Sequence, residues 1–370
     1  MQPTLLKRLA FLFCLQFCAL TLLAQKDLPQ DYLSKEFHQG RRAAARALMP
    51  DNSVMVVFAA PTRTFSNDVE YLYHQNPDLY YFTGYKEPHA VLFIFKEDQT
   101  ANGGKYYELF FVQEKNAQQE QWTGRRLGEK GVREKLGIAA VYNGQQFKEY
   151  ALDPTGFSKI LMAPLPEDVR NNRGTSDLYD LIAQFKNKAN ISDTQKNEKL
   201  DSRLFQQITA KLREIKTPEE LLLIRKAVEI SCIGQNEVMK TIRPDMSELE
   251  LQGLHEYVHK RYGAEGVGYG SIVGAGENGC ILHYTENSRT RIGNNLLLMD
   301  VGAEYHGYTA DVTRTVPAHG KFSPDEKAIY QIVYDAQEAA FKTLKDGSKW
   351  ADANKAAQET IAIGLLKLGI

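Results

Sequence analysis

The stretch LLLMDVGAEYHGYTADVTRTV, from Leu296 to Val316, decides the architecture of the C-terminal half of the chain. Asp300 and Asp311 each end an apolar stretch, and a turn-like EYHGY separates them. A hairpin folded about Tyr305 and His306 would place the two aspartates almost opposite each other on one face, with Cβ atoms about 5 Å apart. Carboxylates that close repel each other unless a cation lies between them. The stretch therefore predicts a hairpin that carries a metal site.

The chemistry of such a site follows from the charge of the pair. Two divalent ions about 3.5–4 Å apart would bridge the carboxylates and hold a water between them as a nucleophile. The alternative is that both aspartates are surface turn residues. Asp300 argues against it, because the residue follows the apolar run LLLM, which predicts a core strand where an unpaired carboxylate is costly.

Just upstream, the segment VGAGENGC has glycines in the GxGxxG spacing of a dinucleotide site, with Asp300 about 20 residues on. That site requires a helix directly after the glycines, whereas ILHYTENSRTR predicts a strand and then a polar loop. We therefore interpret Gly274, Gly276 and Gly279 as turn residues that line a pocket. His283, in ILHYTEN, is a candidate for binding substrate or moving protons, and a structural histidine is the alternative.

Other residue patterns in the sequence do not predict a metal site or a catalytic nucleophile. His255 and His259 stand four residues apart on a predicted helix, a spacing compatible with a metal, but HExxH is absent and the helix is polar. We interpret the pair as a solvated face. No GxSxG elbow, P-loop or cysteine–histidine nucleophile pattern is present in the sequence.

Length and composition limit the functional classes. The 370 residues contain 45 Lys and Arg against 46 Asp and Glu, for a net charge of −1, so a nucleic-acid partner is not expected. The 43% hydrophobic and 25% charged residues are ordinary for a soluble globular protein of about two domains. Cys232 and Cys280 form no disulfide framework or CxxC site, and we interpret them as core or near-site thiols.

Residues 1–24 predict a secretory signal peptide. Lys7 and Arg8 precede an apolar run from Leu9 to Leu23, which ends at the small residue Ala24. A run of this length is shorter than the roughly 20 residues that span a membrane, although a signal anchor is the alternative. We expect export to the periplasm or outside the cell, with no membrane attachment after cleavage. N-terminal sequencing of the exported protein would test this.

The rest of the chain predicts two domains. Four apolar runs bounded by turn residues predict strands covered on both faces, and hence an α/β domain at residues 25–205. These runs are SVMVVFA (53–59), AVLFIFK (90–96), YYELFFV (106–112) and KILMAP (159–164). After a polar helical connector, Thr217 as N-cap and Pro218 at the first helical position begin the helices of a second domain, residues 206–370. Further helices are expected to about Tyr262, from Pro324 to Leu344 and from Asp352 to Leu368.

Several segments together resemble the aminopeptidase P (Xaa-Pro aminopeptidase) family of pita-bread metallopeptidases. They are FAAPTRTFSNDVEYLYHQNPDLYYFTGYKEPHAVLFIF, QEKNAQQEQWTGRRLG, IVGAGENGCILHYTEN and MDVGAEYHGYTADVTRTVPAHGKFSPDE. The resemblance implies a creatinase-like α/β N-terminal domain followed by an α+β pita-bread catalytic domain. It implies hydrolysis of the N-terminal Xaa-Pro bond of peptides with proline in second position, through a water activated by two divalent metals, manganese above all.

The same resemblance implies roles for individual residues. Asp300 would chelate one metal and Asp311 would bridge both. His283 would be the catalytic and substrate-binding histidine near the metals, and Tyr269 would support the metal-binding carboxylates. Trp122, in WTGRRLG, would help form the pocket for the proline side of the substrate, across a subunit interface if the protein forms a homo-oligomer.

The sequence departs from the family at its C-terminal end. The family's remaining ligands, one histidine and two glutamates, follow the helix that matches ETIAIGLLKLGI, where the 370 residues end. We therefore expect a catalytic domain truncated at its C-terminus and an inactive fragment. Two alternatives stay open: a prolidase that cleaves Xaa-Pro dipeptides, against which WTGRRLG and SNDVEY argue, and a non-catalytic peptide-binding or scaffold protein of the same fold.

Overall fold

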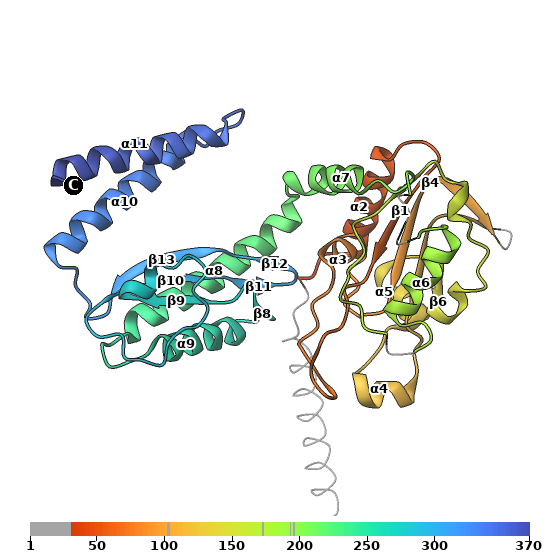
Figure 1. Ribbon diagram of the computed structural model, residues 1–370, viewed down its shortest axis with the longest axis horizontal. Helices are drawn as coiled ribbons and strands as arrows, with labels where there is room; N and C mark the ends of the chain where they lie inside the picture. The colour runs from red at the N-terminus through yellow and green to blue at the C-terminus, as the bar shows by residue number, and fades with distance from the viewer. Residues whose placement is uncertain (1–30, 102–103, 172–173, 193, 195–196) are drawn as a thin grey trace, which may run out of the picture. The chain divides into compact units, whose positions relative to one another are not determined.

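The computed structural model describes residues 31–370 except 102–103, 172–173, 193 and 195–196 (Figure 1). The predicted signal peptide lies outside these residues and stays a prediction. The chain forms two compact units, which meet in sequence between Leu222 and Leu223. Each unit is described by itself below.

The first unit is built on a five-stranded mixed sheet. Its strand order is β6 (Val141–Asn143), β5 (Gly104–Val112), β4 (Val91–Ala101), β1 (Ser53–Phe58) and β7 (Lys159–Leu161). The central pairs β1/β4 and β4/β5 are antiparallel, and the outer pairs β1/β7 and β5/β6 are parallel. All four strands predicted for this half are confirmed.

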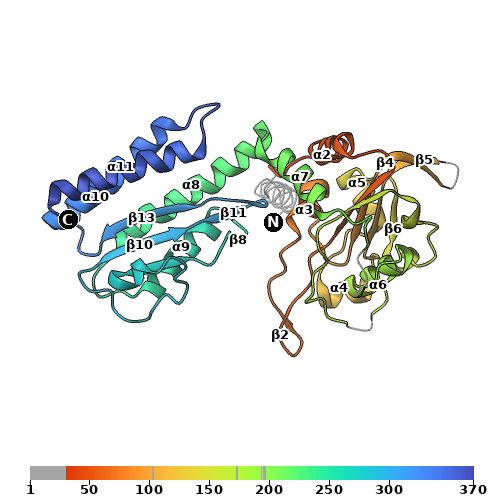
Figure 2. The ribbon, with the colours of Figure 1, turned by 45° about the horizontal axis from the view of Figure 1, so that its top comes forward.

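The apolar runs are covered on both faces of this sheet, as predicted. Side chains alternate along β1, so that Val54 and Phe58 contribute to one core and Met55 and Val57 to the other. One core also takes in side chains of α2 (Lys35–Leu48), α3 (Pro77–Thr83), α5 (Gly128–Leu136) and α7 (Ser202–Glu214). The other takes in α6 (Leu178–Lys188), as Figure 2 lets the reader follow. The unit also contains α4 (Ala117–Thr123) and the hairpin β2 (Thr64–Ser66) to β3 (Val69–Glu70).

The domain boundary predicted after residue 205 is wrong, because it falls inside α7. Phe205, Ile208 and Leu212 of this helix are buried in the core that also holds Phe37 and Leu79. The connector helices therefore belong to the first unit. The sequence shows their apolar spacing but not the surface against which they pack.

The second unit begins in α8 (Pro218–Thr241), whose start is capped as predicted. The Thr217 backbone N–H donates to Glu220 Oε2 at 2.7 Å, and the Glu220 N–H donates to Thr217 Oγ1 at 3.4 Å. The next helix, α9 (Glu248–Arg261), leads into a three-stranded sheet of order β13 (Val312–Pro317), β10 (Leu296–Val301), β9 (Ile272–Ala275). A smaller sheet has the order β12 (Tyr308–Thr309), β11 (Ala303–Tyr305), β8 (Gly266–Val267).

The last two helices, α10 (Pro324–Thr343) and α11 (Trp350–Leu368), pack against each other and confirm the helices expected there. The α/β first unit and α+β second unit agree with the predicted fold class. Cys232 and Cys280 are free and exposed, so the core location in their interpretation as core or near-site thiols is wrong. Across the described ranges, no helix is long and apolar enough to cross a membrane.

Candidate metal centre

The predicted hairpin exists, but its turn lies one residue later than expected. Tyr305 pairs with Tyr308, so His306 and Gly307 are the two central turn residues, with φ of 51° and 81°. Positive φ at both positions is typical of the tight turns that join antiparallel strands. The shift moves the register, so that Asp300 lies opposite Thr313 and Asp311 precedes Thr313 by two residues. The aspartates are therefore diagonal neighbours and not an opposed pair.

Asp300 is half-buried and does not lie in the core, contrary to the argument from the run LLLM. Burial alternates along β10: Leu297, Met299 and Val301 are buried, whereas Leu298 and Asp300 lie on the opposite, partly open face. The apolar run indicated burial on both faces, but here only one face of the strand enters the core. Asp311 is exposed. Both carboxylates can thus be reached from solvent.

Tyr269 brings the two carboxylates together. Its hydroxyl donates to Asp300 Oδ1 at 2.5 Å and lies 3.4 Å from Asp311 Oδ1. The two Oδ1 atoms, sharing this neighbour, are at most 5.9 Å apart. Burial raises the pKa of the Tyr269 hydroxyl above its usual value, and the hydrogen bond to Asp300 and the nearby negative charges raise it further. The tyrosine thus stays a neutral donor that orients Asp300.

Gly302 permits this arrangement. A Cβ built on this residue would lie 1.8 Å from the Ala310 carbonyl oxygen and 2.9 Å from the Tyr269 ring. The backbone just after Asp300 therefore passes directly against the backbone just before Asp311, and any side chain here would force them apart. The glycine of MDVGAEY is explained by this close approach.

The carboxylates of Asp300 and Asp311 provide some of the ligands that a hard divalent ion needs. Two carboxylates that converge from neighbouring strands offer the oxygen ligands that Mn²⁺ and Mg²⁺ prefer. In the part of the chain that the structure describes, no third histidine, cysteine or acidic residue joins them in a group able to hold a metal. Asp300 and Asp311 thus supply a portion of a coordination sphere.

His283 lies in an exposed turn, so the strand predicted for ILHY is wrong. The glycine segment continues as the short 3-10 helix η3 (Gly276–Cys280), which supports the rejection of a dinucleotide site. A Cβ on Gly279 would lie 3.4 Å from Leu298 Cβ. Leu298 shares a strand face with Asp300, so the segment that bears His283 packs over the face that carries the aspartate.

Trp122 belongs to the first unit. It lies in α4, and its side chain is 86% exposed. The structure thus brings Asp300, Asp311 and Tyr269 together and places His283 on the adjoining loop.

The interpretation of His255 and His259 as a solvated face is wrong. Their side chains are 0% and 1% exposed, and their ring centroids are 5.3 Å apart. A Cβ on Gly234 of α8 would lie 2.5 Å from His255 Nδ1, so α8 covers the pair. Burial, and to a smaller extent the neighbouring His259, lower the pKa of His255 to about 3. The polar composition of α9 did not reveal that a second helix lies on this side.

Glu248 was missed by the sequence analysis. In SELELQ the Ser-x-x-Glu spacing marks Glu250 as a capping-box residue, but nothing in the pattern shows that Glu248 is buried and Glu250 exposed. The Glu248 side chain is nevertheless buried, at 2% exposure, and contacts both ends of the segment that bears His283. Only the fold around α9 reveals this difference.

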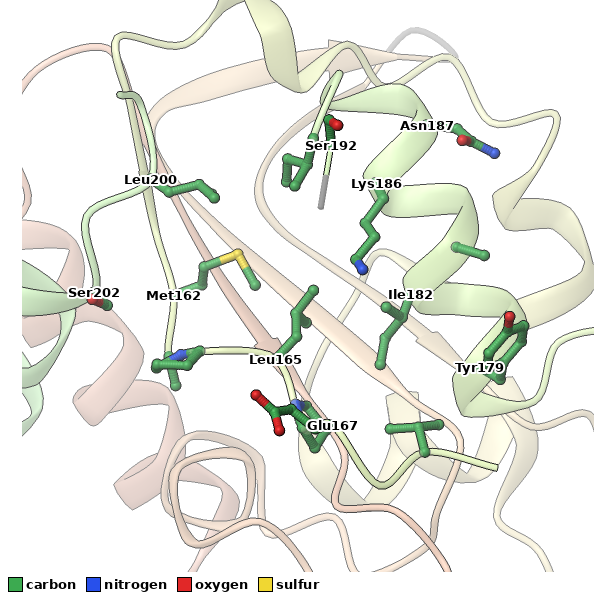
Figure 3. Close-up of a pocket in the computed structure, with 16 residues that line it drawn as sticks. Met162, Leu165, Glu167, Tyr179, Ile182, Lys186, Asn187, Ser192, Leu200 and Ser202 are labelled. Carbon is green, nitrogen blue, oxygen red and sulfur yellow. The ribbon is translucent and has the colours of Figure 1, made fainter. Parts of the chain in front are cut away.

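A cavity of about 970 Å³ lies in the first unit, away from these side chains in sequence. Figure 3 shows Met162, Leu165 and Ile182 gathered about its centre, with Lys186 pointing toward them. None of the predicted site residues lines it. Its lining is mostly apolar, and its polar side chains, among them Glu167, Lys186 and Ser192, include no group of three histidine, cysteine or acidic residues able to hold a metal within the described ranges.

Comparisons with known proteins address both units. Residues 223–368 match the metallopeptidase family M24, and residues 38–155 match the aminopeptidase P N-terminal domain. A Xaa-Pro aminopeptidase of Escherichia coli (strain K12) is 34% identical over 351 residues, which are 91% of this chain and 74% of that protein. One of Haemophilus influenzae is 32% identical over 340 residues, with the same coverage of both chains.

The fold agrees with these sequence matches. The structure of Pseudomonas aeruginosa aminopeptidase PepP superposes with a TM-score of 0.79 at 32% identity, and covers 91% of this chain and 74% of its own. A variant of Escherichia coli aminopeptidase P in complex with substrate gives a TM-score of 0.80 with the same identity and coverage. Sequence and structure thus point to the same relatives.

Proposed function

Because the chain belongs to the M24 metallopeptidases and carries the aminopeptidase P N-terminal domain, we propose that it serves hydrolysis of the N-terminal Xaa-Pro bond of peptides. The proposed substrates are peptides with proline in second position, as the names of the relatives state for those proteins. The proposed cofactor is a pair of divalent ions, with manganese preferred. The observation that carries the proposal is the convergence of Asp300 and Asp311 on the Tyr269 hydroxyl.

Each residue of this constellation has a definite task in the proposal. The two aspartates hold the metals, which when bound polarise the scissile carbonyl and lower the pKa of a water. Tyr269 donates to Asp300 Oδ1 and leaves the other carboxylate oxygen free to face an ion. His283, exposed on the loop beside this face, binds the substrate.

We further propose that the 370 residues alone are inactive. Two carboxylates in an exposed setting hold a divalent ion weakly, because each lost ligand removes a large part of the binding free energy. The purified chain should release no N-terminal residue from an Xaa-Pro-Yaa tripeptide at millimolar Mn²⁺. Robust turnover would contradict the claim that further ligands are essential.

The positive test begins with the source gene beyond the codon for Ile370. If the frame continues, the longer product should cleave the tripeptide when Mn²⁺ is present, and Asp300→Asn and Asp311→Asn should each abolish cleavage. Asp325→Asn, on an exposed helix start, is the control and should keep full activity. A longer product that cleaves only the Xaa-Pro dipeptide would favour a prolidase instead. No cleavage of either peptide would favour a non-catalytic role.

A further inference from the structure

Glu248 is a buried carboxylate at the start of α9. Its neighbour Ser247 caps the helix together with Glu250, so Glu248 is not needed for the capping box. At 2% exposure, a carboxylate loses most of its hydration, which is costly unless hydrogen bonds replace the lost water. The partners of this side chain therefore reveal its task.

Four donors from one segment converge on the Glu248 carboxylate. Oε1 accepts from the Ala275 backbone N–H at 2.7 Å and from Asn278 Nδ2 at 3.0 Å. Oε2 accepts from the Tyr284 hydroxyl at 2.8 Å and from the Ser288 N–H at 2.5 Å. Ala275 and Ser288 are the two ends of a loop, so one side chain ties both ends to the same helix.

The tip of this loop carries the predicted substrate-binding histidine. Ile281 and Leu282 are 54% and 88% exposed, and His283 beside them is exposed as well. Tyr284, the next residue, is buried with its hydroxyl on Glu248. The carboxylate thus holds the residue adjacent to His283, while Gly279 packs against Leu298 on the strand that carries Asp300.

A second contact with α9 supports the same loop. Asn287, whose φ is 47°, accepts from the Val273 N–H at 2.9 Å and donates to the Ser271 carbonyl at 2.9 Å. It also donates to Gln252 Oε1, one helical turn after Glu248, at 2.7 Å. This contact fixes only the C-terminal end of the loop, whereas Glu248 joins both ends.

We propose that Glu248 is a positioning residue: its buried carboxylate clamps the base of residues 275–288 and thereby presents His283 to substrate beside Asp300 and Asp311. The inference rests on the proposed function for the role of His283. The clamp itself depends only on the hydrogen bonds above.

Glu248→Gln tests the clamp with almost no change in volume. A glutamine keeps one acceptor oxygen but places an NH₂ donor against two donors of the loop, so about half of the contacts are lost. Loss of two hydrogen bonds to a charged acceptor should speed amide exchange in 275–288 about 10- to 100-fold in hydrogen–deuterium exchange of the 370-residue chain. Tyr284→Phe removes one donor and should give a smaller increase.

Glu250→Gln is the matched control. It lies in the same turn of α9, it is exposed, and glutamine serves the capping box as glutamate does. Exchange in 275–288 should stay as in the parent chain. Unchanged exchange in both Glu248→Gln and Tyr284→Phe would overturn the clamp, whether or not the protein cleaves peptides.

Kinetics of a longer, active product separate positioning from general stability. Glu248→Gln should raise KM for an Xaa-Pro-Yaa tripeptide about tenfold or more, with a smaller effect on kcat, because the role proposed for His283 is to bind the substrate. A merely structural role would lower the active fraction and leave KM unchanged, and that result would overturn positioning. If even the parent product is inactive, the proposed function fails and the exchange result still decides the clamp.

Discussion

At the scale of single residues, the site depends on groups that do no chemistry. Tyr269 orients the Asp300 carboxylate and Glu248 holds the loop 275–288, both through hydrogen bonds. Gly302 allows the backbones beside Asp300 and Asp311 to touch. The sequence identified Asp300 and Asp311 as a pair. It identified Tyr269 only through a family resemblance and Glu248 not at all, because hydrogen-bond partners distant in sequence leave no local pattern.

Gly302→Ala should destabilise the second unit by about 1–3 kcal/mol, because the new methyl group would overlap the Ala310 carbonyl. Urea unfolding followed by circular dichroism measures this. Gly253→Ala, in the exposed middle of α9 with no atom within 4 Å of its Cβ, is the control and should stabilise by about 0.5–1 kcal/mol. Equal unfolding midpoints for both variants would refute the close approach.

At the scale of secondary-structure elements, local signals located most helices and strands but not their exposed sides. The polar α9 carries a buried histidine pair on the side that α8 covers, and β10 buries only alternate residues of its apolar run. A helix cap such as Thr217 is local, so sequence reasoning finds it. Which side of an element meets another element is not local.

His255 should make the second unit sensitive to acid. Burial is the main cause that lowers the folded-state pKa of His255 from 6.5 to about 3. Burial also lowers the pKa of His259, and the charge of Glu256 on the same helix partly offsets that lowering. Below pH 6.5 the unfolded chain therefore binds more protons than the folded one, and stability falls as the pH drops from about 6.5 toward 3. His255 alone should account for about 2 kcal/mol between pH 7.5 and 5.

The measurement is the free energy of unfolding in urea at pH 7.5 and pH 5. His255→Leu should show a smaller difference between the two pH values than the parent chain. His319→Leu, at an exposed position in the same unit, should show the parental difference. An identical pH difference in His255→Leu and the parent chain would show that this histidine is not buried as the structure has it.

At the scale of the whole molecule, the core of the first unit is made by residues that precede the second unit in the chain. The hydroxyl of Tyr81 donates to the Leu212 carbonyl at 3.0 Å, and Arg213 pairs with Asp78 at 3.0 Å, so α7 is joined to the first unit by polar contacts as well. Residues 31–222 should therefore fold by themselves.

A shorter chain tests where the unit ends. Residues 31–205 lack Ile208 and Leu212, whose burial contributes about 3–6 kcal/mol together, a large share of the roughly 5–15 kcal/mol by which a domain is stable. Circular dichroism should show cooperative melting for residues 31–222 and a far lower or absent transition for residues 31–205. Equal melting of the two would restore the earlier boundary.

The sequence by itself determined four of the five strands of the first sheet, the helix starts, the hairpin with its two aspartates and the family resemblance, since each rests on residues close together in the chain. Tertiary structure alone decided that the hairpin turns at His306 and Gly307, that His255 is buried and that Glu248 holds the loop of His283. The physical reason is that register and burial depend on which backbone or side chain lies opposite. That neighbour comes from another part of the chain, so packing and not local pattern selects it.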